Sequence, residues 1–278
     1  MKKGKKKGIV LTLILSVLSI VYVAPLVIVF YNSLKKKAYI SRYPFKLPDE
    51  KSFAELKNFE KGVEKTEFLN AFLCSLTITV LSVFLIILCT SMCAWFITRV
   101  QNKLTKGLYF LFVFSMVVPF QMVMFTLSKT ADTLHLTNPI GIAIVYLGFG
   151  AGLAVFMFSG FIKGIPLEIE EAAAIDGCSP LRTFFSVVIP ILRPTMLSVT
   201  ILETMWIWND YLLPYLILDR KKYTTIPIAV QYLKGGYGSV DMGAMMAALV
   251  LSIIPILVFY FALQKYIVKG VIAGAVKG

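Results

Sequence analysis

The sequence predicts an all-α integral membrane protein with six transmembrane helices. Of its 278 residues, 58% are hydrophobic and only 15% are charged, and the mean hydropathy is +0.80. Soluble domains are roughly 45–50% apolar and about 25% charged, so a water-soluble enzyme of ordinary composition is excluded. Six apolar runs each supply the ~20 residues that a helix needs to cross a hydrocarbon core of ~30 Å. Helices are expected because lipid offers the backbone no hydrogen-bond partners.

The apolar runs set the expected boundaries within a single transmembrane domain, residues 1–278. The spans are expected at 9–32, 69–98, 104–127, 139–163, 186–218 and 242–268. Hydrophilic connections are expected at 33–68, 165–190 and 219–241. Within the third span, Pro119 predicts a kink beside the exposed polar side chain of Gln121.

The first span is expected to be retained in the mature protein. It follows the basic sequence MKKGKKK, which looks like the start of a signal peptide, but residues 9–30 hold 22 positions without a charge. The apolar region of a signal peptide has about 7–15 residues and ends at a small-residue cleavage site, neither of which is present. The run therefore predicts a transmembrane helix.

The charged residues suit a membrane protein better than a nucleic-acid-binding protein. The 28 Lys and Arg residues exceed the 15 Asp and Glu residues, for a net charge of +13. The basic residues lie mostly between apolar runs, where they meet lipid headgroups, and do not share a helix face with stacking aromatic residues. The four cysteines form no CxxC pair and His135 is the only histidine, so we expect no metal site, disulfide or histidine-based catalysis.

Charge alone does not orient the chain. With the N-terminus inside, the inner and outer segments each carry 14 Lys and Arg residues, and the positive-inside rule does not decide between the two orientations. An even number of spans places both termini on one side of the membrane.

The connection 165–190 contains a well-specified short helix, expected at about residues 166–176. Pro166 is a favoured first residue, and Glu168, Glu170 and Glu171 follow at the positive end of the helix dipole. Gly177 is expected to end the helix. Such a helix fits a groove on another protein. The alternative is a helix lying on lipid headgroups, which the clustered glutamates disfavour because anionic lipids repel them.

This connection resembles the EAA loop of ABC importer permeases. The matching residues are Glu171, Ala172, Ala173, Gly177 three residues later, and Val187, Ile189 and Pro190 after nine more. Val187 and Ile189 stand where the family pattern has Ile and Leu. The strings ETMWIWNDYLLP, TIPIAVQYL and GVIAGAVKG resemble the carbohydrate-uptake branch, specifically the smaller permease of maltose-type importers.

The resemblance implies a non-catalytic permease subunit for a sugar or oligosaccharide that forms half of the translocation pathway. It implies that a coupling helix contacts an ATPase subunit through Glu171, Ala172, Ala173, Asp176, Gly177 and Pro190. It also implies a second permease subunit in a heterodimer, two ATPase subunits, an extracellular solute-binding protein, and a multi-pass location in the cell membrane with both termini cytoplasmic. ATP and Mg²⁺ would be bound by the ATPase, because the glycine-rich string GFGAG at 148–152 lacks the Lys-Ser/Thr of a P-loop.

The fifth span holds carboxylates inside an apolar run. Glu203, Trp206 and Asp210 are spaced i, i+3, i+7 and are expected on one helix face. A charge at the bilayer centre costs ~2.5–3.5 kcal/mol, so such residues face a cavity or a partner. In one interpretation they line the translocation pathway, where Asn209 and the carboxylates bind hydroxyl groups and Trp206 or Trp208 stacks on a sugar ring. In the other, Glu203 or Asp210 pairs with a basic group or helix end at the interface with the second permease.

The connection 219–241 resembles the segment that reaches into the binding protein. The candidate contact residues are Tyr232, Gly235, Gly236 and Tyr237. The alternative is an ordinary solvated connection.

The sequence favours a sugar permease over three other functions. An importer of another solute, such as glycerol phosphate, would need basic residues along the pathway. A secondary transporter would need paired broken spans or repeats. A membrane enzyme would need clustered His or Asp residues at one membrane face.

Overall fold

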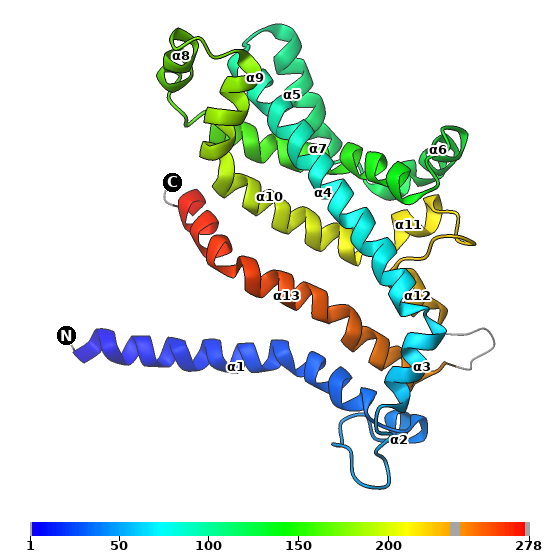
Figure 1. The fold of residues 1–278 in the computed structure, drawn as a ribbon. Helices are drawn as coiled ribbons and strands as arrows, with labels where there is room; N and C mark the ends of the chain where they lie inside the picture. The colour runs from blue at the N-terminus through cyan, green and yellow to red at the C-terminus, as the bar shows by residue number, and fades with distance from the viewer. Residues whose placement is uncertain (1, 234–239, 276–278) are drawn as a thin grey trace. The chain divides into compact units, whose positions relative to one another are not determined.

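The computed structural model describes residues 2–233 and 240–275, with side chains described for 8–233 and 240–264. Within these residues the chain is helical, and the only β-type pairing is an isolated bridge between Lys35 and Phe53. The expected all-α fold is confirmed (Figure 1). The elements are α1 (Lys2–Ser33), α2 (Lys37–Arg42), α3 (Lys57–Lys65), α4 (Phe68–Arg99), α5 (Lys103–Ser115), α6 (Phe120–Thr133), α7 (Pro139–Ile162), α8 (Glu168–Ile175), α9 (Pro180–Thr183), the π-helical turn η1 (Phe184–Val188), α10 (Ile189–Asn209), α11 (Leu212–Ile217), α12 (Ile226–Tyr232) and α13 (Met242–Ala275).

Helices that can cross a membrane account for most of the chain. Five are long and apolar enough among the described residues: Gly8–Ser33, Phe68–Arg99, Pro139–Ile162, Pro180–Asn209 and Met242–Gln264. The pair α5 and α6 makes a sixth if its two halves form one span. The chain is a multi-pass membrane protein.

The third expected span is broken, not merely kinked. In place of one helix over 104–127, α5 ends at Ser115 and α6 begins at Phe120, with a bend of 105°. Pro119 is the N-cap of α6 in an extended conformation, with φ −63° and ψ 133°. Proline has no backbone N–H to continue a helix, and its ring keeps the preceding residue out of the helical region. The side chain of Gln121 is exposed, as expected.

The fifth expected span, 186–218, differs from the structure at both ends. The helix begins earlier, at Pro180, where the Ser179 hydroxyl accepts a hydrogen bond from the Arg182 N–H. It passes through the π turn η1 into α10, with the N–H of Ile189 donating to the carbonyl of Phe184. It ends at Asn209, because Asp210 is extended with ψ 123°. Residues 212–217 form the separate short helix α11.

The chain divides into two compact units. One contains Met1–Leu69 and Ala229–Pro255, and the other contains Asn70–Ile228 and Ile256–Gly278. We describe each unit by itself.

In the first unit, α3 packs against the first turns of α13 (Figure 1). A Cβ on Gly62 would lie 3.0 Å from the Ala244 carbonyl oxygen, so a glycine favours this close approach. The buried Lys35 fixes the chain after α1: its Nζ donates to Asn32 Oδ1 and to the Tyr43 carbonyl, both at 3.0 Å. Burial lowers the pKa of Lys35.

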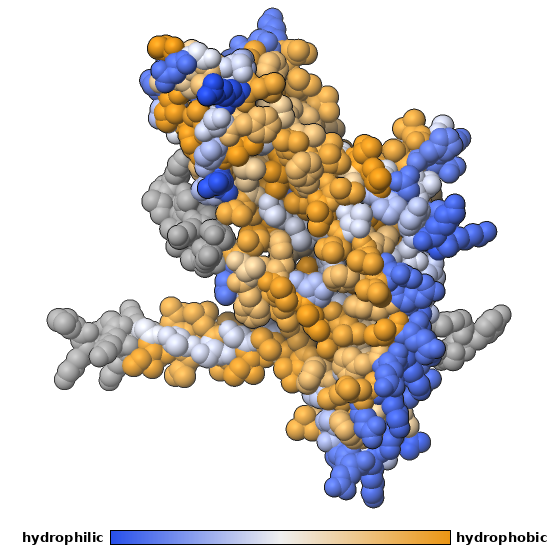
Figure 2. Space-filling model, viewed as in Figure 1, coloured by the Kyte–Doolittle hydropathy of each residue, from blue (hydrophilic) through white to orange (hydrophobic). Residues whose placement is uncertain are grey.

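The second unit holds the main core. Its buried side chains come mostly from α4, α7 and α10, and include Ile86, Tyr146, Phe158, Leu192 and Val199. Apolar residues also cover much of the outer surface of these helices (Figure 2), as expected for helices that face lipid.

Candidate functional site

The short helix α8 ends at a glycine in the left-handed conformation. Gly177 has φ +80°. Its N–H donates to the Ala174 carbonyl, and the N–H of Cys178 donates to the Ala173 carbonyl, each at 3.0 Å. These two bonds form a Schellman motif, in which glycine avoids the steric cost of a Cβ. Residues 168–175 are helical and Asp176 is the C-cap, close to the expected helix at 166–176.

The two faces of α8 differ sharply. Glu170 and Ala173 are buried against the rest of the unit. Glu171 and Ala172 are exposed, and Ile175 is 87% exposed. The outward face therefore carries small, acidic and apolar groups, including an isoleucine that nothing in the described chain covers.

An ion pair anchors the inner face of α8 to the end of α4. Arg99 donates from Nε (2.9 Å) and Nη2 (2.7 Å) to Glu170 Oε1. The indole N–H of Trp95 donates to Glu170 Oε2 at 2.8 Å, and Arg99 Nη2 also donates to the Ile165 carbonyl at 3.1 Å. Both carboxylate oxygens are thus satisfied at a site where the Arg99 and Glu170 side chains are only 19% and 9% exposed. Such a charge-assisted network fixes orientation as well as contributing energy.

Sequence analysis did not identify this anchor. It treated Glu170 as one of three acids in the first turn of the helix, and it gave no role to Trp95 or Arg99. The available signal was weak: Arg99 is the first charged residue after the long apolar run of α4. Nothing in the sequence joined it to a glutamate 71 positions away.

Glu203 lies in the interior of the second unit. It is 2% exposed, and its Oε2 has no hydrogen-bond partner among the described residues. A Cβ built on Gly150 would lie 3.0 Å from this oxygen, so α7 approaches it closely. Gly150 was not among the residues that the sequence singled out.

The structure brings Glu203, Trp206 and Asp210 to the same side, next to α7, as expected. Glu203 lies beside Gly150, and Trp206 packs against Tyr146, one turn earlier on α7. Trp206 is 41% exposed while Glu203 is buried, and Asp210 follows the last residue of α10. Asp210 Oδ2 accepts a hydrogen bond from the Tyr146 hydroxyl at 2.9 Å. Its Oδ1 accepts from the backbone N–H of Leu212 at 2.9 Å, at the start of α11. Asp210 therefore bonds to a hydroxyl of α7 and to the first N–H of α11 within its own chain.

The remaining residues of this region divide between interior and surface. Trp208 is 6% exposed and packs edge-on against Phe72, with ring centroids 5.9 Å apart. Asn209 is exposed and donates to the Met205 carbonyl at 2.7 Å. Trp206 packs edge-on against Tyr146 at 5.4 Å. Trp206 and Asn209 are therefore the candidate pathway residues that lie on the surface of this chain.

The other candidate residues are only partly described. Tyr232, at the end of α12, is 55% exposed, whereas Gly235, Gly236 and Tyr237 lie outside the described residues. The four cysteines are free, and the described residues contain no group of three or more His, Cys, Asp or Glu that could hold a metal ion.

Comparison with known proteins identifies the family. Residues 86–273 match the family described as the inner membrane component of binding-protein-dependent transport systems. The chain belongs to this family. It is therefore a permease component of a binding-protein-dependent importer, and the matched region includes α7, α8 and α10.

Relatives match this permease from end to end. The probable starch degradation products transport system permease protein of Thermoanaerobacterium thermosulfurigenes is 37% identical over 277 residues, covering 100% of both chains. The melibiose/raffinose/stachyose import permease protein of Bacillus subtilis is 32% identical over 283 residues, again covering 100% of both. A crystal structure of a bacterial ABC transporter that imports the acidic polysaccharide alginate contains a chain with the same fold, with a TM-score of 0.78 and 22% identity over 96% of this permease and 98% of that chain.

Replacing Gly177 with alanine should loosen α8. The left-handed conformation costs an L-residue roughly 1–2 kcal/mol, and no neighbour within 4 Å adds a steric term. Hydrogen–deuterium exchange of residues 168–178 should accelerate about 5–30-fold, the factor that corresponds to 1–2 kcal/mol. Asparagine tolerates this conformation better, so Gly177→Asn should exchange more slowly than Gly177→Ala. Equal exchange in the wild type and both variants would contradict the role of the turn.

Proposed function

We propose that this permease imports a sugar or oligosaccharide and forms half of the translocation pathway. The observation that carries the proposal is the end-to-end match to relatives described as permeases for starch degradation products and for melibiose, raffinose and stachyose. A third relative, from Streptococcus mutans, is described as a multiple sugar-binding transport system permease and is 32% identical over 268 residues.

We further propose that α8 couples the permease to a separate ATPase subunit. Glu171, Ala172 and Asp176 are exposed and would make the contact. Ala173 packs inward and would position the helix, Gly177 would form the turn, and the exposed Pro190 would lie near the same surface. The ion pair between Arg99 and Glu170 supports this role, because a helix that transmits force must be fixed to the spans that move. Two ATPase subunits would bind the ATP and Mg²⁺, and this chain would perform no catalysis.

This coupling role assigns an orientation. With α8 in the cytoplasm, both termini are cytoplasmic, and α2, α3 and α12 lie outside. Tyr232 would then contact the solute-binding protein, together with Gly235, Gly236 and Tyr237.

A second permease subunit would complete the pathway as a heterodimer. The apolar segment of α1 supports this, because none of its most apolar 18-residue window is buried within this chain, and it is available to a second subunit as well as to lipid. Trp206 and Asn209 would contact the solute. An indole face can stack on a sugar ring, and the amide can bond hydroxyl groups. Glu203, Trp208 and Asp210 would support them from within the unit.

Reconstituted transport tests the proposal. The importer should be purified with its second permease and ATPase and placed in proteoliposomes with ATP inside, and the binding protein and solute should be added outside. We expect saturable, ATP-dependent uptake of labelled maltotriose or raffinose that exceeds uptake of glycerol 3-phosphate. Uptake of glycerol 3-phosphate alone would overturn the sugar assignment, and full uptake without the ATPase would overturn the coupling role.

A further inference from the structure

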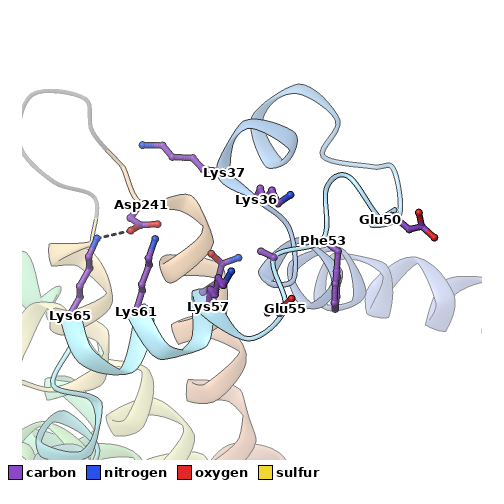
Figure 3. Close-up of a pocket in the computed structure, with 11 residues that line it drawn as sticks. Lys36, Lys37, Glu50, Phe53, Glu55, Lys57, Lys61, Lys65 and Asp241 are labelled. Atoms are coloured by element: carbon purple, nitrogen blue, oxygen red, sulfur yellow. Dashed lines mark hydrogen bonds and ion pairs between the residues drawn. The ribbon is translucent and has the colours of Figure 1, made fainter.

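A cavity of about 610 Å³ lies in the first unit (Figure 3). It is formed by the segment after α1, by α3 and by the residue before α13. Five lysines line it: Lys36, Lys37, Lys57, Lys61 and Lys65. Sequence analysis assigned no function to this part of the chain.

Three of these lysines form a row on α3. Lys57, Lys61 and Lys65 are four residues apart, so they share one face of the helix, and Figure 3 shows them projecting from the same side. The neighbouring face, with Asn58 and Gly62, is buried. Like charges at i, i+4 destabilise a helix by about 0.2–0.5 kcal/mol for each pair. The repulsion between these lysines therefore lowers the stability of α3.

The carboxylates of the cavity do not neutralise the row. Lys65 donates to Asp241 Oδ2 at 2.6 Å, and this is the one ion pair found among the described residues of the cavity. Burial would raise the pKa of Asp241, but the hydrogen bonds from Lys65 and from the Ala244 N–H hold the pKa below its usual value. Asp241 is thus ionised and already paired.

The other lysines remain available to an outside anion. Lys36 donates to the Lys51 carbonyl at 2.8 Å, which leaves its charge uncompensated. Lys37, Lys57 and Lys61 are exposed and have no carboxylate within salt-bridge distance among the described residues. Glu50 and Glu55 also line the cavity, but neither makes such a contact.

We propose that this lysine pocket docks an acidic patch on the solute-binding protein. The inference rests on the proposed function, which places α2 and α3 outside. The family transports solute by way of a binding protein, so a soluble protein must meet this side of the permease. The pocket suits carboxylates from a protein surface, because lysines are strongly hydrated point charges on flexible stems and four of its five lysines form no ion pair among the described residues.

Charge reversal of Lys57 and Lys61 tests this proposal. The complete importer carrying Lys57→Glu and Lys61→Glu should be placed in nanodiscs and titrated with its solute-binding protein at low and high salt. Complementary charge accelerates association, and like charges in contact are strongly unfavourable, so we expect affinity to fall about tenfold or more at low salt. The loss should come mainly from slower association and should shrink at high salt, where exposed charges are screened.

The matched control reverses two basic residues outside the pocket. Arg42 and Lys51 are exposed on the same segment, do not line the cavity and form no ion pair among the described residues, so Arg42→Glu with Lys51→Glu changes the net charge equally. This control should keep most of the affinity. The neutral variant Lys57→Gln with Lys61→Gln should show an intermediate loss. The melting temperature of the purified complex should match the wild type in all variants, which verifies folding.

Three outcomes would overturn the docking surface. The first is an affinity for the binding protein that Lys57→Glu with Lys61→Glu leaves unchanged. The second is an equal loss of affinity in the control. The third is a loss that appears in nanodiscs of phosphatidylglycerol and vanishes in phosphatidylcholine, which would assign the pocket to lipid headgroups. Failure of the proposed function looks different: the wild-type importer would carry no oligosaccharide at all, whatever the affinity of the variants for the binding protein.

Discussion

Replacing Arg99 with methionine should reduce ATP-driven uptake at least about tenfold, equivalent to 1.4 kcal/mol of lost coupling, while the chain still inserts into the membrane. The variant leaves the Glu170 carboxylate with no cation at a site that is 9% exposed. Removing one partner of a buried pair costs about 3–5 kcal/mol, and the partial exposure of Arg99 lowers that figure here. We expect α8 to detach from α4, since the Trp95 indole is then the only side chain holding Glu170.

Two further variants separate charge from geometry at this anchor. Arg99→Lys keeps the charge but cannot donate from two nitrogens of a planar group, so uptake should recover only in part. Adding Glu170→Gln to Arg99→Met removes the uncompensated charge and should restore some stability. Uptake by proteoliposomes and the melting temperature of the purified complex are the measurements. An uptake rate of Arg99→Met within about twofold of the wild type, less than 0.5 kcal/mol, would show that the ion pair is not needed for coupling.

Replacing Ala172 with arginine should block coupling from the opposite face of α8. Ala172 is exposed, so the substitution should change the stability of the permease by no more than about 0.5 kcal/mol. An ATPase subunit seated on this face has no room for a long charged side chain. We expect uptake to fall at least about tenfold, with weaker copurification of the ATPase.

Ala174 provides the matched control on the same helix. It is also exposed but lies about 160° around the helix axis from Ala172, at 3.6 residues per turn. Ala174→Arg introduces the same group and should retain more activity. Equal losses in the two variants would show that any bulky residue on α8 is harmful, which would remove the support for a specific docking face.

Much of the membrane topology could be predicted because hydropathy is a local property. A run of 20 apolar residues identifies a span without knowledge of its neighbours, and α1, α4, α7 and α13 lie where the runs predict them. The end of α8 was predictable for a similar reason, since a glycine at a helix end signals the left-handed turn that Gly177 adopts.

Breaks within apolar runs were harder to predict. Hydropathy continues smoothly through Pro119 and Asp210, but the backbone does not. A proline in a span can kink or break the helix, and the outcome depends on packing around it. Asp210 ends α10 because its carboxylate finds the Leu212 N–H and the hydroxyl of Tyr146 on another helix. A helical wheel drawn through residue 210 therefore gave the side on which it lies, next to Tyr146, but not the end of the helix.

Long-range pairs could not be predicted from one sequence. The spacing of Glu168, Glu170 and Glu171 tells which of them share a face, but not which face turns inward. Only the fold brings Glu170 to Arg99, or Lys65 to Asp241 across 176 positions. The anchor of α8 and the lysine pocket both depend on such pairs.

Cysteine cross-linking between α8 and the ATPase tests the central claim most directly. The four native cysteines, Cys74, Cys89, Cys93 and Cys178, should first be replaced by serine or alanine in the complete importer. A single Ala172→Cys, on the outward face, should then cross-link to a cysteine placed in the cleft of the ATPase subunit, and the yield should change when ATP binds. Ala173→Cys, which faces inward, should react poorly. No cross-link from position 172, or an equal yield from position 173, would contradict the account.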